Sequence, residues 1–204
     1  TLVTSAQFVL AALVACVAAL AAGLGRLSGF WPVRGLAAFY IEVFRGTSLL
    51  VQLYWIFFVL PLFGISLPKF QAGFLSVGLN VGAYGAEIVR GAILSVPRGQ
   101  WEAGYALSMS PARRMRRIIL PQALALMLPP WGNLMIELLK GTALVALIAV
   151  PDLMFVAKQI NGATFRSAEA FGAALIIYYL LARVLITPAM RGVERVMARR
   201  LGRA

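Results

Sequence analysis

The sequence predicts an all-α integral membrane protein with five transmembrane helices, and three observations support this. The chain is 61% hydrophobic and only 13% charged, whereas a soluble domain carries about 25% charged residues. Its mean hydropathy is +0.87. Its apolar residues form solid runs of about 20, the length that crosses a bilayer core of about 30 Å, without the alternation typical of membrane β-barrels.

The expected passes lie at about 5–25, 47–64, 70–94, 118–150 and 169–190. Between the first two passes, the basic segment 26–45 is amphipathic enough to lie at the membrane interface. After the fourth pass, the amphipathic stretch "PDLMFVAKQI", which begins at Pro151, is expected to lie flat on the outer side as a gate, a docking surface or a plain interfacial helix. No boundary divides the chain, so residues 1–204 are expected to form a single transmembrane domain.

The fourth hydrophobic region is informative because of its length. As one helix, residues 118–150 would span roughly 50 Å, which overshoots the bilayer core, so we expect a break or a bend. Pro129-Pro130 and Gly141-Thr142 are the expected places, since proline removes a backbone donor and glycine relaxes the chain. A broken helix at membrane depth is tolerated only where it is buried or lines a cavity, which indicates transport. Because no internal repeat is visible, the chain is expected to form half of a pathway that a second subunit completes.

Basic residues set the expected orientation. Thirteen arginines and lysines lie in the segment 26–45, in the segment 98–117 and in the tail from residue 191, whereas three lie on the other side, namely Lys69, Lys158 and Arg166. The positive-inside rule therefore places the N-terminus outside, and the segment 98–117 and the C-terminus in the cytoplasm. This distribution explains the net charge of +12 without a nucleic-acid partner. With no histidine and the single Cys16, the chain offers no zinc ligand set and no internal disulfide.

The polar interruption from residue 98 reads "RGQWEAGYALSMSPARRMRRIILP", and it is expected to form two short helices. Ser110 is a good N-cap and Pro111 suits the first helical position, so the second helix is expected to run straight into the membrane. The arginines by themselves would hold lipid headgroups, which makes membrane lipid an expected partner. The helix around Trp101 and Glu102, in contrast, needs a partner protein to bury its apolar face.

This segment resembles the EAA cytoplasmic loop of ABC importer permeases, whose pattern is Glu-Ala-Ala, three residues, Gly, nine residues, then Ile-x-Leu-Pro. Glu102 and Ala103 match, Gly104 takes the place of the second alanine, Ser108 takes that of the glycine, and residues 118–121 match completely. Glycine inside a helix costs about 1 kcal/mol relative to alanine, and serine adopts positive φ less readily than glycine. The two departures leave the exact geometry of the loop open.

The resemblance covers nearly the whole chain. The stretches "FRGTSLLVQLYWIFFVLP", "LNVGAYGAEIVRGAILSVPRGQWEA" and "ILPQALALMLPPWGNLMIELLKGTALVALIAVPDL" are similar to the polar amino-acid permeases, a subfamily of these importers. Within it, "GQWEAGYALSMSPARRMRR" and "LPPWGNLMIELLKGTALV" look most like permease subunits for ectoine and hydroxyectoine. The resemblance implies a type I ABC importer permease fold, with a cytoplasmic coupling loop at about 98–117 that docks on an ATP-binding subunit through Trp101, Glu102, Ala103, Gly104, Ser108 and Arg113.

The implied assembly supplies what this chain lacks. No Gly-x-x-x-x-Gly-Lys-Ser/Thr phosphate loop occurs, so the chain is expected to be a transport subunit with no ATPase site and no cofactor of its own. ATP and Mg would be bound by two copies of an ATP-binding subunit, joined by a second permease, the same or a paralogue, and by an external solute-binding protein. The expected location is the bacterial inner membrane. A self-contained, ion-driven secondary transporter and a non-transporting membrane subunit are the alternatives.

Six polar residues inside the expected passes are candidates for the solute pathway: Asn80, Tyr84, Glu87, Glu137, Lys140 and Thr142. A zwitterionic solute, either an amino acid or an ectoine-like compatible solute, needs a carboxylate for its cation and donors for its carboxyl group. Charges inside membrane helices are costly and mark functional sites. The pairs Glu87–Arg90 and Glu137–Lys140 are also spaced to neutralise each other. The asparagine and the tyrosine, which share a helix face with Glu87, are also suited to tying helices together.

Overall fold

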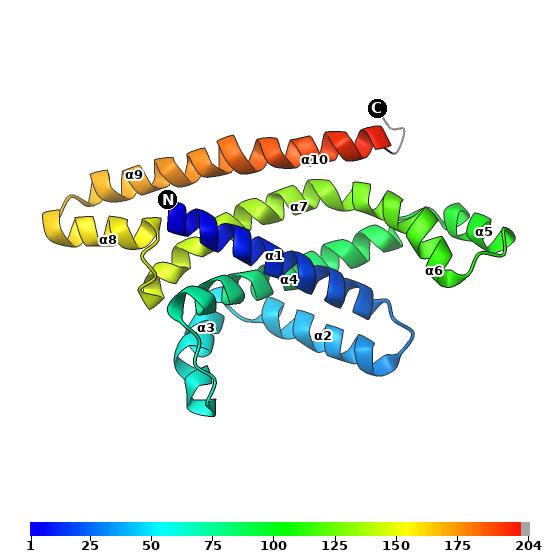
Figure 1. The fold of residues 1–204 in the computed structure, drawn as a ribbon, viewed down its shortest axis with the longest axis horizontal. Coiled ribbons are helices and arrows are strands. Elements are labelled where there is room, and N and C mark those ends of the chain that lie inside the picture. The colour runs from blue at the N-terminus through cyan, green and yellow to red at the C-terminus, as the bar shows by residue number, and fades with distance from the viewer. Residues whose placement is uncertain (201–204) are drawn as a thin grey trace.

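The computed structural model describes residues 1–200, with side chains described over 1–197, and every regular element within that range is a helix (Figure 1). The α-helices are α1 (Leu2–Arg26), α2 (Trp31–Gly46), α3 (Leu49–Tyr54), α4 (Lys69–Leu94), α5 (Arg98–Ala106), α6 (Pro111–Arg114), α7 (Leu120–Thr142), α8 (Leu153–Thr164), α9 (Ser167–Leu180) and α10 (Thr187–Arg200). Wider π-helical turns form η1 (Trp55–Val59), η3 (Met115–Ile119) and η5 (Leu181–Ile186), and tighter 3₁₀ turns form η2 (Leu60–Phe63) and η4 (Ala143–Ile148). The predicted all-α class is confirmed.

Four helical runs are long and apolar enough to cross a membrane: Leu2–Arg26, Lys69–Leu94, Pro111–Ile148 and Ser167–Met197. The number of spans rises to five, with Ser167–Met197 as the fifth along the chain, if α2 and the run α3–η2 count as one, although they meet at 108°. The passes expected at 5–25, 70–94 and 169–190 are therefore confirmed, but the pass expected at 47–64 does not stand alone. A run from Leu49 to Phe63 reaches only about 22 Å, which is shorter than the bilayer core.

The basic segment after α1 is helical as expected, but as α2 it packs against membrane helices instead of standing apart. It contacts α1 and α4, and the Tyr40 hydroxyl donates a hydrogen bond of 2.6 Å to the Leu79 carbonyl of α4. The bend after α2 is held by Gln52, whose amide donates to the Phe44 carbonyl at 2.9 Å and to Thr47 Oγ1 at 2.7 Å. The bent pair is thus fixed by side chains within the bundle.

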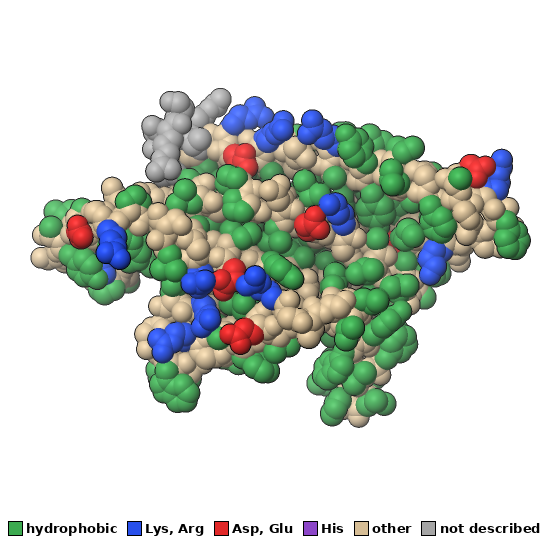
Figure 2. All heavy atoms as spheres, turned by 180° about the vertical axis from the view of Figure 1, so that it is seen from behind, with side chains coloured by type: hydrophobic (Ala, Val, Ile, Leu, Met, Phe, Trp, Pro, Cys, Tyr) green, Lys and Arg blue, Asp and Glu red, His purple; other side chains and the backbone are tan. Residues whose placement is uncertain are grey.

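α4 is the central helix of the molecule. It packs against α1, α2, α3 and α7, and 67% of its membrane span is buried, against 17% for the span formed by α9, η5 and α10. Hydrophobic side chains also cover much of the outer surface (Figure 2). Such a surface is expected where helices face lipid or another chain.

Small residues allow α1 and α4 to approach closely. Ala11, Ala15 and Ala19 have no exposed surface and lie four residues apart on one face of α1. On α4, a Cβ at Gly78 would lie 2.8 Å from the Ala11 carbonyl oxygen, and a Cβ at Gly85 would lie 2.8 Å from the Ala19 Cβ. The interface therefore has the small-residue packing typical of membrane helices.

The helix does not break at Pro129-Pro130, the first of the two places where a break or a bend is expected. α7 continues through both prolines. Directly after them, the Trp131 ring packs against α4, where a Cβ at Gly85 would lie 2.7 Å from it. Packing against neighbouring helices is one setting in which membrane helices tolerate proline.

The second expected break, at Gly141-Thr142, is only a change in helix type. The α-helix ends at Thr142, and the chain tightens into the 3₁₀ turns of η4. The helical run then ends at Ala149, whose φ of 57° is left-handed. The whole run, Pro111–Ile148, is continuous.

Each π-helical turn ends two residues before a proline. η1 precedes Pro61, η3 precedes Pro121 and η5 precedes Pro188. Proline has no N–H, and its ring clashes with the carbonyl four residues earlier, so a locally wider turn lets the helix continue. In η5 the Thr187 hydroxyl adds a hydrogen bond of 2.9 Å to the Ala182 carbonyl.

Candidate functional site

The elbow formed by α5, α6 and η3 projects at one end of the molecule (Figure 1). α5 ends in a turn at Ser108, whose φ is 51°. The Met109 N–H donates to the Gly104 carbonyl at 3.0 Å, and the Ser108 N–H donates to the Tyr105 carbonyl at 2.8 Å. These two bonds form a Schellman motif. The loop therefore keeps its left-handed residue even with serine in place of glycine.

The second arm of the elbow begins where the sequence predicts. Ser110 is extended and Pro111 is the first residue of α6, although the Ser110 side chain makes no capping hydrogen bond. From Pro111 the chain passes through η3 into α7 without a break. The elbow is thus continuous with a membrane span, and not a separate unit.

Gly104 has a packing role that the sequence does not reveal. A Cβ at this position would lie 2.5 Å from Arg114 Cδ and 2.7 Å from its Cγ. Arg114 is only 5% exposed, and its guanidinium carbon lies 3.6 Å from the ring centroid of Tyr105 and 5.7 Å from that of Trp101. A desolvated cation–π contact of this kind is worth about 2 kcal/mol. Glycine and arginine together lock α5 against α6.

The elbow candidates besides Gly104 and Ser108 differ in solvent exposure. Three are exposed: Glu102, Ala103 and Arg113. Trp101 is half-buried and packs against a core cluster from α1, α4 and α7. The sequence predicts that the apolar face of α5 needs a partner protein. Part of this face is already covered, because Trp101 and Gly104 pack against the chain itself. Leu107, which follows α5, remains 72% exposed.

Asn80 joins three helices. It is 7% exposed, and its amide donates to the Phe44 carbonyl at 3.1 Å and to Gln52 Oε1 at 3.0 Å. These bonds link α4 to α2 and α3 at the 108° bend. A buried amide whose donors are used in this way favours the role of tying helices together.

Both expected ion pairs form. Arg90 Nη2 lies 2.8 Å from Glu87 Oε2, and Lys140 Nζ lies 2.8 Å from Glu137 Oε1. The Glu87 side chain is 24% exposed, whereas the Glu137 and Lys140 side chains are 64% and 63% exposed. The pair on α7 is therefore open to the surroundings of this chain.

The two remaining pathway candidates lie in different environments. Tyr84 is 41% exposed, and the Arg45 guanidinium carbon lies 5.3 Å from its ring centroid. Thr142 is fully buried and donates a hydrogen bond of 2.7 Å to the Leu139 carbonyl. The six candidates do not converge on one place in this chain, since Asn80 and Thr142 are bonded inside it and the other four are open to its surface.

Asp152 is a buried carboxyl that the sequence reading did not single out. It is 1% exposed, it caps α8 by accepting from the Phe155 N–H at 2.8 Å, and it accepts from the Tyr178 hydroxyl at 3.2 Å. Burial raises the pKa of this carboxyl above its ordinary value, against the opposing effect of its hydrogen bonds. The next N–H, of Leu153, donates to Thr4 Oγ1 at 3.0 Å. An aspartate before an amphipathic helix is an N-cap signal that could have identified it.

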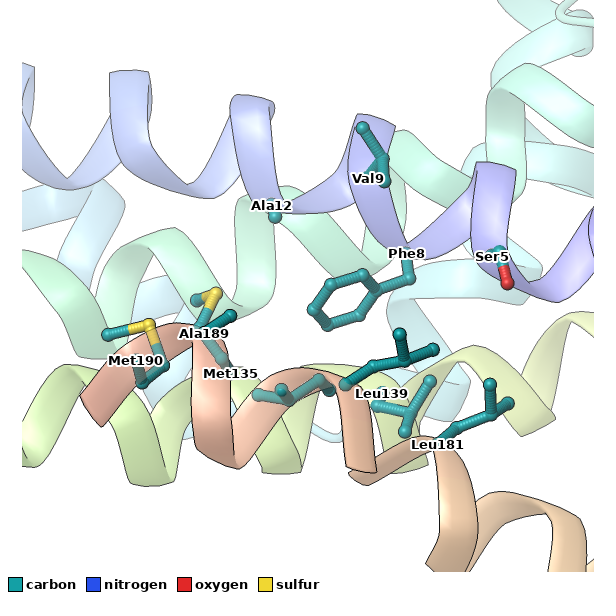
Figure 3. A pocket seen from close by; sticks show the side chains of 11 residues that line it. Ser5, Phe8, Val9, Ala12, Met135, Leu139, Leu181, Ala189 and Met190 are labelled. Carbon is teal, nitrogen blue, oxygen red and sulfur yellow. The ribbon is translucent and has the colours of Figure 1, made fainter. Parts of the chain in front are cut away.

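An apolar cavity of about 410 Å³ lies between α1, α7 and the start of α10 (Figure 3). Phe8 of α1 points toward α7 and η5 here, and Met135, Leu139 and Met190 also line the cavity. Among its lining residues only Ser5 has a polar side chain. The cavity therefore lacks the polar groups that would hold a zwitterion.

A central buried helix, four or five apolar spans and a rigid polar elbow at one end define a polytopic helical membrane protein. Residues 11–199 match the family described as "Binding-protein-dependent transport system inner membrane component". The chain belongs to this family.

Individual relatives agree with this family. A "Probable amino-acid ABC transporter permease protein" of Sinorhizobium fredii is 46% identical over 175 residues, which cover 83% of this chain and 74% of that protein. The L-cystine transport system permease protein of Bacillus subtilis is 40% identical over 192 residues, covering 91% and 77%. A crystal structure of an amino acid ABC transporter with histidines aligns with a TM-score of 0.87 at 36% identity, covering 96% of this chain and 91% of that one.

These comparisons establish the type I fold and a permease subunit of the amino-acid ABC transporter type. Such subunits are transport components of the inner membrane, and the ATPase belongs to a partner. The family implies ATP-binding subunits and a substrate-binding protein as partners.

Proposed function

We propose that this chain couples ATP hydrolysis in partner subunits to the import of a small polar zwitterion by alternating access. The elbow carries this proposal. α5 is locked onto α6 through Gly104 and Arg114, and α6 continues into α7 as one helical run, Pro111–Ile148. A push on α5 would therefore move the membrane part of α7. Rigid-body motion of this kind is a common switching device.

In this proposal the six elbow residues have different tasks. Glu102, Ala103 and Arg113, which are exposed, contact the ATP-binding subunit. Trp101 and Gly104 face the chain itself, and Ser108 forms the turn; these three set the angle of α5. The EAA pattern then describes a docking surface and the residues that hold it in place.

The proposed complex contains two copies of the ATP-binding subunit, which bind ATP and Mg, a second permease that is the same chain or a paralogue, and an external solute-binding protein. The N-terminus lies outside and the C-terminus in the cytoplasm. The exposed Glu137–Lys140 pair supports a second permease, because a charged pair on a membrane span is costly in lipid and a facing subunit would enclose it. The fifth span, of which only 17% is buried, supports the same conclusion.

The proposed solute is an amino acid or an ectoine-like compatible solute. The relatives named for amino acids support the first, and the two quoted stretches that resemble ectoine permeases support the second. Tyr84, Glu87, Glu137 and Lys140 are open enough to face a pathway between two permeases. Asn80 and Thr142, whose hydrogen bonds lie within the chain, would hold in place the helices that line this pathway.

The proposal is tested by reconstitution. The chain is co-expressed with the ATP-binding subunit from its own genome, purified and placed in liposomes with the matching solute-binding protein. We expect co-purification, ATP hydrolysis that rises when loaded binding protein is added, and uptake of one solute from a panel that contains L-cystine, L-histidine, L-glutamine and ectoine.

The alternatives give different results. Uptake that follows an ion gradient and needs no ATP would indicate a secondary transporter. A complex that assembles with the ATPase but transports no member of the panel, with hydrolysis unchanged by the binding protein, would indicate a non-transporting subunit.

A further inference from the structure

Arg183 is an arginine inside a membrane span that the sequence reading did not single out. It lies in η5, within the span Ser167–Met197, and it is exposed. Among residues 1–197 it forms no ion pair, and its side chain forms no hydrogen bond. An unpaired charge at this depth is costly and marks a functional position.

Arg183 opens onto a cavity of about 700 Å³ between α7, α8, α9 and η5. Small-molecule sites have volumes of about 300–1,000 Å³ and combine apolar walls with a few polar groups. The polar side chains here are Lys140, Arg183, Thr187 and the hydroxyls of Tyr178 and Tyr179, and the remaining lining residues are apolar. Unlike the cavity in Figure 3, this one has cationic groups.

The charges of this cavity do not cancel. Lys140 is paired with Glu137 at 2.8 Å, whereas Arg183 has no carboxylate partner in the described chain. The site therefore has one positive charge in excess. A guanidinium presents a planar fork that binds a carboxylate through two hydrogen bonds.

The local backbone also sets Arg183 apart. It lies in a π-helical turn ahead of Pro188, and the Thr187 hydroxyl bonds to the Ala182 carbonyl within this turn. π-helical turns occur frequently at functional sites. A proline two residues after η5 thus fixes a wide turn where the unpaired cation projects.

We infer that Arg183 binds the carboxylate of the transported solute in the cavity next to the Glu137–Lys140 pair. This inference rests on the proposed function and adds a binding residue to it. Glu137, which pairs with Lys140 beside this cavity, would exchange that lysine for the cationic group of a zwitterion. The fifth span then contributes directly to solute recognition, in addition to α4 and α7.

The first test asks whether position 183 lines an aqueous cavity, and it does not depend on transport. Arg183→Cys and, as a control, Val184→Cys are made in a Cys16→Ala background, and the assembled complex is treated in liposomes with a membrane-impermeant sulfonate thiol reagent. We expect residue 183 to react at least about tenfold faster than residue 184, because only the former lines the cavity and thiolates react only where water reaches them. Equal rates, or no reaction at 183, would show that Arg183 faces lipid and would overturn the inference.

The second test measures uptake of the panel solute that the wild type transports. Arg183→Gln is expected to lower the maximal uptake rate at least about tenfold, because a charge-assisted, bidentate contact is lost, while Arg183→Lys retains part of the rate. Arg191→Gln is the matched control, since Arg191 lies on the same helical run outside the cavity. Uptake by Arg183→Gln equal to that of the control would overturn the inference.

An anionic lipid headgroup is the other source of a negative group for Arg183. The uptake comparison is therefore made in liposomes of phosphatidylcholine alone and again with phosphatidylglycerol. We expect the same loss in both. A loss confined to phosphatidylglycerol liposomes would assign Arg183 to lipid and not to the solute. If the wild type transports nothing, the proposed function fails, and the reactivity at position 183 still decides whether the cavity is as inferred.

Discussion

At the scale of single residues, the elbow shows that two departures from a family pattern can be explained by structure. Gly104 stands where the pattern has alanine, and the stem of Arg114 occupies the space that an alanine methyl group would need. Ser108 stands where the pattern has glycine, yet it adopts φ of 51° within a Schellman motif. From the sequence, both departures leave the geometry of the loop open, because propensity alone does not include the partner that fills the gap.

Gly104→Ala is expected to destabilise the elbow by about 1–3 kcal/mol, as overpacking does. The reason is the separation of 2.5 Å between the new Cβ and Arg114 Cδ. Adding Arg114→Ala should recover part of the loss, since the clash disappears while the cation–π contact is not restored. Thermal unfolding of the purified complex measures both effects. Gly99→Ala on the same helix, where no atom lies within 4 Å, is the control, and an equal shift for both glycines would contradict this account.

Asp152 predicts a dependence of stability on pH. Because burial raises the pKa of the folded carboxyl above 3.8, the folded state binds a proton more readily than the unfolded state. Stability contributed by this group is therefore lost as the pH rises through the window above 3.8. Asp152→Asn keeps an oxygen for the α8 cap and removes the charge, so it should flatten this fall in melting temperature between acidic and neutral pH.

The control for that measurement is Asp152→Ala. It removes the cap as well as the charge and should be about 1 kcal/mol less stable than the asparagine variant. A wild type whose melting temperature rises over the same pH window would contradict the raised pKa.

At the scale of helices, the hydrophobic runs predicted most of the spans, since solid apolar runs leave few alternatives in a bilayer. What they could not predict is how prolines are accommodated. α7 continues through Pro129-Pro130, and the Trp131 ring that follows packs against α4, a contact between residues far apart in the sequence. The second pass forms a bent pair with α2 for a similar reason, since the bend after α2 is set by hydrogen bonds of Gln52 and Asn80.

Close packing of α1 on α4 leads to a further prediction. Gly78→Ala should destabilise the folded chain by about 1–3 kcal/mol, because the new methyl group would lie 2.8 Å from a backbone oxygen that cannot rotate away. Thermal unfolding in detergent measures the effect. Gly172→Ala on α9, where nothing lies within 4 Å, should leave the melting temperature unchanged, and a similar loss in both variants would point to helix propensity instead of packing.

At the scale of the whole molecule, the sequence predicted where the elbow lies but not a single solute site. The elbow is encoded locally, by an N-cap, a proline and a run of arginines. The six pathway candidates are spread over the chain, and those open to its surface depend on what faces them. Arg183 carries the same signal as the other charges inside the expected passes, but its cavity is formed with α7, α8 and α9, which only the structure brings together.

Glu102→Lys tests whether the elbow links ATP hydrolysis to solute uptake in the proposed complex. Glu102 is exposed and forms no ion pair within the described chain, so the change should leave folding intact. Reversing a charge at an interface is costly by several kcal/mol, so we expect uptake to fall at least about tenfold. ATP-driven uptake and melting temperature are measured together. Glu169→Lys, at the opposite end of the molecule on α9, is the control, and full uptake by Glu102→Lys would remove the elbow from the mechanism.

The π-helical turn η3 also sets the angle at which α5 and α6 are rotated about the axis of α7. A π turn is one residue longer than the α turn it replaces, and each residue of an α-helix advances by about 100°. Deleting one residue from Met115–Ile119 would rotate α5 and α6 by about that angle around the axis of α7. α5 and α6 would keep their contact through Gly104 and Arg114, but Trp101 would leave its place against α4 and α7. The extra residue of η3, ahead of Pro121, therefore sets the direction in which α5 and α6 point relative to α7.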